Sequence, residues 1–196
     1  MSDIYETRKS IRKYKDKEVP EELIREVLEA GRVAPSAKNR QPWRFIVYRG
    51  ESKAELLNCL EKGIEKQKKN PFIPGPYKKG LASAENTLRI MREAPVTVIV
   101  LNERSGNPYM PVLAGKRISE IHNTLSIGAA VENMLLKACE LGLGGLWIGN
   151  TVYSHAQLIK FIGTKKQIAC AVSLGYPDEE PEGRPRMELE EIVEFR

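Results

Sequence analysis

The sequence Ser126-Ile-Gly-Ala-Ala-Val-Glu-Asn-Met-Leu-Leu-Lys-Ala-Cys-Glu-Leu-Gly142 carries the strongest helical pattern in the chain. Ser126 is a residue type that caps helix N-termini, and Gly142 is the type that ends helices. Apolar side chains recur at helical spacing around most of the circumference: Ile127, Val131, Met134, Leu135, Leu136, Ala138, Cys139 and Leu141. Such a helix is buried from more than one direction. The pattern predicts a central core helix, a helix at a subunit interface, or both.

Outward from this helix, four apolar runs of strand length predict buried strands at residues 45–48, 95–101, 143–149 and 168–174. Helical patterns occupy most of the stretches between them: 21–34, 52–64, 81–93 and 154–163. Helices outnumber strands, and the strands are dispersed along the chain, which predicts an α+β fold. No internal repeat or linker divides the sequence, so residues 1–196 are predicted to form a single domain.

Three local signals refine these boundaries. Ser52 with Glu55, and Ser154 with Gln157, have the spacing of capping boxes that open helices. Residues 70–80 contain three prolines and two glycines, which predicts a loop. Residues 189–195 are predicted to add a short edge strand or to lie along a partner.

Composition restricts the class of protein. Hydrophobic residues make up 41% and charged residues 29% of the chain, which is typical of a globular protein. No apolar run is long enough to span a bilayer, and the first residues lack the apolar stretch of a secretion signal. We therefore expect no membrane association and a cytoplasmic location.

The net charge of +5 favours an anionic small ligand over a nucleic acid. Acidic residues separate most of the basic clusters, and aromatic residues make up only 7% of the chain, so a continuous basic face with stacking side chains is not expected. Three scattered cysteines and two histidines do not have the spacing of a disulfide framework or a metal site. The cysteines are predicted to be structural.

Familiar catalytic motifs are absent from the sequence. It has no G-x-G-x-x-G opening a βαβ unit, no Walker loop, no H-E-x-x-H and no G-x-S-x-G. Residues 142–145, GLGG, lie between a helix end and a strand, which is the reverse of a phosphate-binding loop. A bound cofactor is therefore the expected source of reactivity.

Three stretches have the composition of binding segments. In residues 8–12, RKSIR, two guanidinium groups and a hydroxyl can converge on a phosphate, although the sequence alone favours a solvated basic segment. Residues 34–43, APSAKNRQPW, combine two prolines with polar side chains that suit a heterocycle, or form a rigid connector. Residues 183–186, GRPR, place two arginines on one side of Pro185, or form a surface turn.

Taken together and in this order, the stretches resemble the FMN-dependent nitroreductase family. The matching pieces are RKSIRKY at 8–14, APSAKNRQPW at 34–43, IGAAVENMLLKA at 127–138, LGLGGLWIG at 141–149, LGYP at 174–177, and Arg184 and Arg186. The match runs almost from end to end and is weakest between residues 58 and 123. Ser126 stands where many relatives have Asp, and residues 62–93 align poorly, which leaves the roles of Asn86 and Arg89 open.

The resemblance implies a nitroreductase-like fold with a mixed central sheet flanked by helices, and a homodimer with FMN at the subunit interface. It implies that the FMN phosphate is held by Arg8, Ser10, Arg184 and Arg186, with Lys9 also among the cofactor-binding residues. It implies that Arg12 reaches the pyrimidine edge of the ring. The neighbouring subunit would contribute Pro35, Ser36, Asn39 and Gln41. Backbone groups would border the ring at Trp147, Ile148 and Gly149.

The implied reaction takes electrons from NADH or NADPH and passes them to a nitroaromatic, quinone or similar acceptor by a ping-pong mechanism. The flavin carries the chemistry, so neither a catalytic side chain nor a metal is expected. Reductive dehalogenation or flavin breakdown on the same fold is an alternative, but the only candidate lid, residues 71–79, is short. A non-enzymatic flavin-binding module is a third hypothesis.

Overall fold

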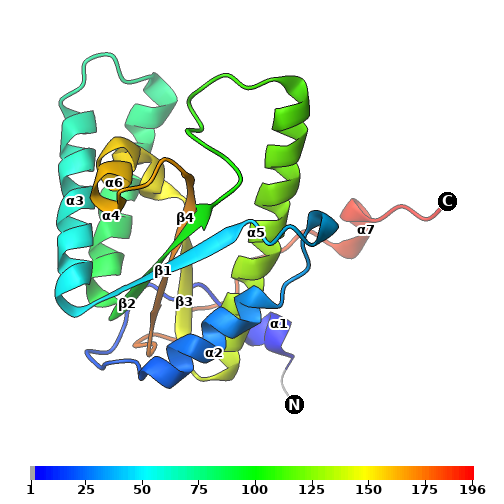
Figure 1. Ribbon diagram of the computed structural model, residues 1–196. Coiled ribbons are helices and arrows are strands. Elements are labelled where there is room, and N and C mark those ends of the chain that lie inside the picture. The colour runs from blue at the N-terminus through cyan, green and yellow to red at the C-terminus, as the bar shows by residue number, and fades with distance from the viewer. Residues whose placement is uncertain (1–2) are drawn as a thin grey trace.

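The protein has an α+β fold in which helices cover both faces of one sheet (Figure 1). The structure is a computed structural model and describes residues 3–196. The sheet contains β1 (Trp43–Arg49), β2 (Val96–Asn102), β3 (Gly144–Ile148) and β4 (Gln167–Gly175). These bounds confirm all four predicted strands to within two residues.

The strand order is β1-β2-β4-β3, and every neighbouring pair is antiparallel. The expected mixed sheet is therefore wrong for the strands of this chain. Within the described residues, parallel pairing is confined to an isolated bridge between Ser10 and Gly145. All seven residues of β2 are buried because strands flank it on both sides and helices cover both faces.

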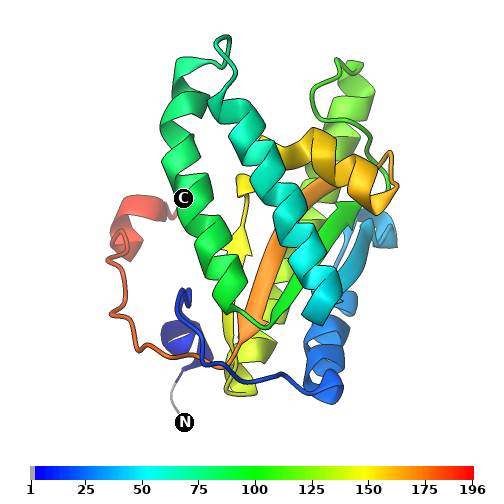
Figure 2. The same ribbon diagram turned by 90° about the vertical axis from the view of Figure 1, so that its left-hand side faces the viewer.

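Side chains alternate along β2 between two hydrophobic clusters. Val96, Val98 and Val100 pack against helices α2 (Glu21–Arg32) and α5 (Ala114–Glu140). Ile99 and Leu101 point to the other face, which is covered by α3 (Gly50–Lys68), α4 (Gly75–Glu93) and α6 (His155–Ile162). Figure 2 shows α3 and α4 side by side in front of the sheet. Short elements complete the fold: α1 (Ile4–Thr7), η1 (Ala37–Asn39), η2 (Asn150–Ser154) and α7 (Leu189–Ile192).

Helix α5 is the predicted central helix, but it begins at Ala114, well before Ser126. Most of its apolar side chains from Ile127 to Ala138 are buried in the core, whereas Leu136 is half-buried. Its first half instead leaves Ile118, Ile121 and Leu125 more than half exposed, and Leu113, just before the helix, is also exposed. Both sequence-based alternatives are therefore compatible with α5, since one half lies in the core and the other presents apolar residues to the outside.

The expected capping boxes do not form. The Ser52 hydroxyl lies in the first turn of α3 and donates to the carbonyl of Arg49 at 2.9 Å. Ser154 does precede α6, but its hydroxyl donates to the carbonyl of Leu60 at 2.6 Å and so joins α6 to α3. Helix α4 begins at Gly75, so the loop expected at 70–80 is shorter than predicted.

The N-terminal segment lies along the end of the sheet. The N–H of Ile11 donates to the carbonyl of Gly145 at 3.1 Å, and the N–H of Lys15 donates to that of Tyr176 at 2.9 Å. A Cβ at Gly144 would lie 2.6 Å from Cγ1 of Ile11, so this approach requires glycine. The glycines at 144 and 145 thus allow the N-terminal segment to pack directly against β3.

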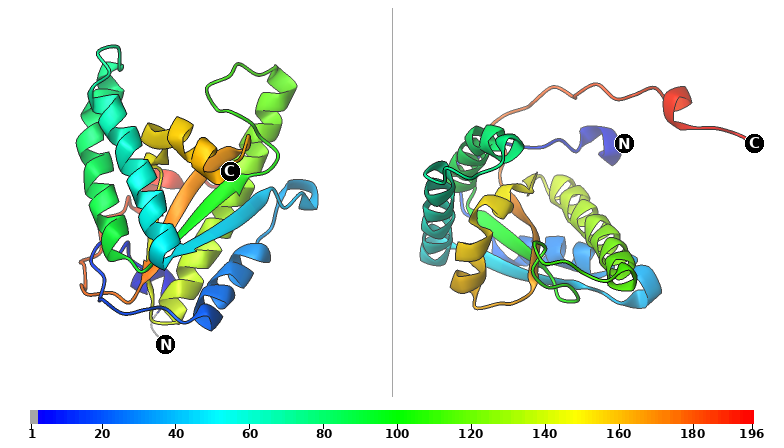
Figure 3. Two further views of the ribbon diagram at one scale, coloured as in Figure 1. Left: turned by 60° about the vertical axis from the view of Figure 1, so that its left-hand side comes forward. Right: turned by 90° about the horizontal axis from the view of Figure 1, so that it is seen from above.

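After residue 180 the chain leaves the body of the molecule (Figure 3). Residues 189–192 form α7 rather than the edge strand that was one of two expectations, and their side chains are exposed. No helix between residues 3 and 196 combines the length and apolarity needed to cross a bilayer.

Candidate functional site: a basic pocket between the two ends of the chain

The N-terminal segment and the start of the C-terminal tail enclose a pocket of about 450 Å³. Six predicted site residues line it: Arg8, Lys9, Ser10, Arg12, Arg184 and Arg186. The first and third binding stretches of the sequence therefore meet in space, although more than 170 residues separate them. Residues 183–186 are exposed, as in the surface-turn alternative, whereas Arg8, Lys9, Ser10 and Arg12 are half-buried.

Backbone pairing brings the two stretches together. The N–H of Asp178 donates to the carbonyl of Lys13 at 3.0 Å, next to a bridge between Tyr14 and Pro177. The carboxylate of Glu179 accepts the N–H groups of both Arg12 and Lys13. Sequence reasoning missed Glu179 because it lies in a charged stretch with no motif of its own.

Five cationic side chains line the pocket, against the carboxylates of Glu6 and Glu182. Arg8 is largely buried, and its Nε lies 3.3 Å from Oε1 of Glu132 on α5, so α5 fixes its direction. The Nη1 of Arg12 donates to the carbonyl of Ser10 at 3.1 Å. The excess of positive charge and the Ser10 hydroxyl make the pocket suitable for a phosphate-sized anion.

The second binding stretch lies elsewhere. Figure 3, seen from above, shows the loop that contains η1 on the opposite side of α5 from the N-terminal segment. One chain therefore does not bring Pro35, Ser36, Asn39 and Gln41 to the basic pocket.

The loop has an unusual backbone. Lys38, Asn39 and Gln41 all have φ between 43° and 54°, the left-handed region that costs a non-glycine residue about 1 kcal/mol. The Ser36 hydroxyl accepts the N–H of Gln41 at 3.0 Å, and the Gln41 side chain donates to Oδ1 of Asn39 at 3.1 Å. Ser126, predicted to cap its own helix, lies inside α5 and accepts the N–H of Ala37 at 3.1 Å.

The third group of predicted residues lies at the end of β3. Ile148 is buried, whereas Trp147 is 43% exposed and its ring lies against Gly128 of α5. Gly149 is exposed, and a Cβ built on it would meet no atom within 4 Å. The space beside the Gly149 backbone is therefore open to a ligand.

The segment after Gly149 is fixed to α4. The side chain of Asn150 donates to Oγ1 of Thr87 at 2.9 Å and to Oγ of Ser83 at 3.3 Å. Asn86 and Arg89, whose roles the sequence left open, bond to each other on the surface of α4 at 3.1 Å. Asn150 was missed by sequence reasoning because its partners lie on a helix more than 60 residues earlier.

Burial shifts the pKa values of the cysteines upward. Burial raises the pKa of Cys170 to about 12. Burial also raises the pKa of Cys139, although the positive charge of Arg8 opposes that shift. A raised pKa favours the protonated thiol at neutral pH.

The model of the Nitroreductase family matches residues 5–176 of this sequence. The chain belongs to the nitroreductase family. The match includes all of the fold from α1 to the end of β4, and with it one side of the basic pocket.

Individual relatives of this nitroreductase family member cover nearly the whole chain. A Methanothermobacter thermautotrophicus protein named NADH dehydrogenase/NAD(P)H nitroreductase is 32% identical over 95% of this chain and 82% of its own. The iodotyrosine deiodinase of Thermotoga neapolitana is 29% identical over 95% and 94%. A nitroreductase crystal structure from Desulfovibrio desulfuricans, in complex with FMN, superposes with a TM-score of 0.71 at 28% identity and covers 98% and 95% of the two chains.

Proposed function

We propose that this nitroreductase family member is an FMN-dependent oxidoreductase that passes electrons from NADH or NADPH to nitroaromatic, quinone or similar small acceptors. The observation that carries the proposal is the basic pocket, where arginines from both ends of the chain surround a space suited to a phosphate. The FMN complex of the Desulfovibrio relative supports the choice of ligand. The cytoplasm, which contains NADH and NADPH, is the compartment that we propose for the reaction.

The residues of the pocket fit the phosphate of FMN. Arginine donates two parallel hydrogen bonds to phosphate oxygens, and a serine hydroxyl can donate a further one. We assign the phosphate to Arg8, Lys9, Ser10, Arg184 and Arg186. Glu132 and Glu179 would not touch the ligand, but they fix the segment that does.

FMN would supply the electron-transfer chemistry when bound. Arg12 would place a fixed positive charge at the pyrimidine edge, where reduction builds negative charge, and would thereby stabilise the reduced form. The open space at Gly149 would allow the flat ring to approach the backbone of residues 147–149. We assign no side chain as catalytic, since no proton transfer or nucleophile is required of one.

We further propose that the protein works as a homodimer. The residues that line the basic pocket do not include Pro35, Ser36, Asn39 or Gln41, so a second copy is needed to bring them to the same ligand. The exposed apolar side chains in the first half of α5 provide a surface that a second copy can cover.

The C-terminal arm, residues 187–196, complements a groove on the body. The arm exposes Leu189, Ile192, Val193 and Phe195 between four glutamates. The groove has a volume of about 960 Å³ and lies along α2 and β1. Its larger apolar residues are Leu28, Val33, Trp43 and Phe45, and its charged residues are mostly basic: Arg25, Arg32, Arg44 and Lys137, against Glu26 and Glu29. It adjoins β1, which pairs with a strand on one side only. We propose that the arm of one copy lies in the groove of the other.

Reductive dehalogenation is a second candidate, favoured by the 29% identity to the deiodinase of Thermotoga neapolitana. The loop between α3 and α4, the only candidate lid that the sequence offered, is short here. The NAD(P)H nitroreductase name of the Methanothermobacter relative favours the first candidate.

One set of anaerobic measurements tests these functions. The purified protein is loaded with FMN, and the flavin absorbance is followed on addition of NADH or NADPH and then of an acceptor. We expect bleaching by a reduced nicotinamide and reoxidation by a nitroaromatic or a quinone. Release of iodide from iodotyrosine, without reoxidation by nitroaromatics, would support the dehalogenase. If neither NADH nor NADPH reduced the bound flavin, the remaining hypothesis would be a non-enzymatic flavin-binding module. A protein that takes up no FMN would refute the proposal.

A further inference from the structure

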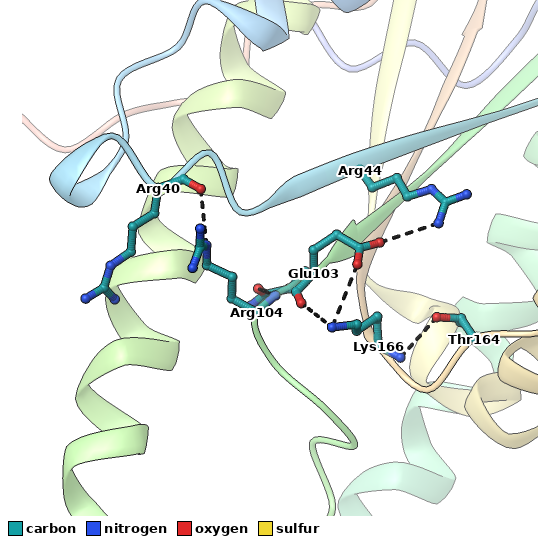
Figure 4. Close-up of polar contacts among 7 residues, drawn as sticks. Arg40, Arg44, Glu103, Arg104, Thr164 and Lys166 are labelled. Atoms are coloured by element: carbon teal, nitrogen blue, oxygen red, sulfur yellow. Dashed lines mark hydrogen bonds and ion pairs between the residues drawn. The ribbon is translucent and has the colours of Figure 1, made fainter.

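We propose that Arg104 is a positioning residue for the cofactor, which it does not touch, because it holds the loop of residues 36–41 in its strained conformation. The Nε of Arg104 donates to the carbonyl of Arg40 at 3.2 Å (Figure 4). The inference rests on the proposed function, which assigns Asn39 and Gln41 of this loop to the flavin of a second copy.

The loop needs restraint from outside. Lys38, Asn39 and Gln41 all have left-handed backbone angles, and none of them is a glycine. Such a conformation persists only where its surroundings stabilise it over the ordinary alternatives. Two hydrogen bonds inside the loop, from the backbone and the side chain of Gln41, do not attach it to the rest of the protein.

Two side chains from distant elements make that attachment. At the start of the loop the Ser126 hydroxyl accepts the N–H of Ala37 and donates to the carbonyl of His122, so the bond is anchored in α5. At the end of the loop Arg104 binds the carbonyl of Arg40. The left-handed residues Lys38 and Asn39 lie between the two points of attachment.

Arg104 is itself held by the rigid end of the sheet. Its N–H donates to Oδ1 of Asn102, the last residue of β2, at 3.2 Å. Asn102 is fully buried and bonds through its Nδ2 to Oε1 of Gln167 in β4 at 3.0 Å. Through Arg104, the loop is therefore connected by hydrogen bonds to the ends of β2 and β4.

Glu103, the residue before Arg104, is also held by hydrogen bonds and charges around it. The N–H of Glu103 donates to the carbonyl of Pro42 at 2.8 Å. Nζ of Lys166 donates to the carbonyl of Glu103 at 2.6 Å. Nη1 of Arg44 lies 3.7 Å from Oε1 of Glu103. In Figure 4 the Arg40 side chain points away from this group, so only its carbonyl takes part.

This geometry supplies a matched pair of variants. Arg104→Ala removes one positive charge and the donor to the loop. Arg40→Ala removes one positive charge from the loop itself but keeps the carbonyl that Arg104 binds. Arg104→Lys keeps the charge and a donor, although a less directional one.

The first measurement is FMN affinity, from quenching of flavin fluorescence by the apoprotein. We expect Arg104→Ala to raise the Kd about tenfold, the effect of a lost hydrogen bond to a charged group. Arg40→Ala should leave the Kd unchanged, and Arg104→Lys should restore part of the loss. If Arg104→Ala and Arg40→Ala lost the same FMN affinity, the loss of positive charge alone would explain the effect, and the inference would be overturned.

The second measurement needs no FMN. Opening of the loop should expose its backbone to trypsin, so the rate at which the peptide bond after Lys38 is cleaved in the apoprotein, followed by mass spectrometry, reports on the attachment. We expect faster cleavage in Arg104→Ala than in wild type, with thermal unfolding monitored to show that the fold is intact. An unchanged rate would show that Arg104 does not hold the loop.

The two measurements separate this inference from the proposed function. Faster cleavage together with weaker FMN binding supports the inference. Faster cleavage with unchanged FMN affinity would show that the loop is held by Arg104 but does not serve the cofactor, and would overturn it. A wild-type protein that binds no FMN would refute the proposed function, and this inference with it.

Discussion

The basic pocket and the loop of residues 36–41 are both polar and both predicted from short motifs, yet they are built differently. The pocket joins segments more than 160 residues apart through backbone hydrogen bonds and the carboxylate of Glu179. The loop is a single short segment in which Lys38, Asn39 and Gln41 have left-handed backbone angles, and it is held by the side chains of Ser126 and Arg104. The difference teaches that the pocket depends on the docking of the two chain ends, whereas the loop depends on individual side-chain bonds.

The largest expected effect comes from removing one end of the chain. Deletion of residues 181–196 removes Arg184, Arg186 and the arm, and two lost charged hydrogen-bonding groups should weaken FMN binding by roughly a hundredfold or more. Fluorescence titration with FMN measures this. Deletion of residues 188–196 is the control, since it keeps both arginines and removes most of the arm. It should lower the dimer content in light scattering. Because the proposed site is shared between two copies, its FMN affinity is measured at a protein concentration where it is still dimeric, and there it should stay close to that of wild type. Equal losses of FMN affinity in the two deletions under that condition would remove the arginines from the phosphate site.

Arg8→Ala tests the pocket at a single side chain. Loss of a hydrogen-bonding group for an anion should weaken FMN binding by about 1.5–3 kcal/mol. Calorimetric titration of the apoprotein with FMN gives the value. Glu132→Gln is the comparison, because it removes the carboxylate beside Arg8 and leaves the guanidinium. Its FMN affinity should stay within a few-fold of wild type, and a loss as large as that of Arg8→Ala would point to Glu132 rather than Arg8.

Gly144→Ala tests the docking of the N-terminal segment. The new methyl group would collide with Ile11, so we expect a loss of about 1–3 kcal/mol in the free energy of unfolding. Urea denaturation measures it. Gly115→Ala, in α5, is the control, because its methyl group would meet no atom within 4 Å and alanine favours a helix. Should Gly144→Ala be as stable as Gly115→Ala, the contact between Gly144 and Ile11 would not be what seats the segment.

The smallest effect is expected in the loop. Lys38 has φ of 54°, and glycine adopts this angle without steric cost. Lys38→Gly should therefore change the free energy of unfolding by less than about 1 kcal/mol, since relief of strain is partly offset by the greater freedom of glycine in the unfolded chain. Thermal unfolding measures the change. A large destabilisation would mean that the lysine side chain itself supports the loop.

Some features followed from sequence alone because they depend on short-range patterns. Continuous apolar runs of strand length predicted four buried strands, and helical spacing of apolar residues predicted the helices, because burial imposes such patterns on neighbouring residues. The predicted capping boxes were wrong at Ser52 and Ser154, since their hydroxyls found carbonyl partners instead. Ser126 likewise serves another segment, and α5 continues well before it.

The sequence by itself determined the α+β class, the family, and which arginines, amides and hydroxyls were candidates for a binding site. Only the tertiary structure decided that the four strands pair antiparallel, that both ends of the chain enclose one pocket, and that the loop lies across α5 from it. The physical reason is the range of the interactions. Periodicity is encoded within a few turns of chain, whereas the bond from Arg12 to Glu179 joins residues 167 positions apart and leaves no local signal.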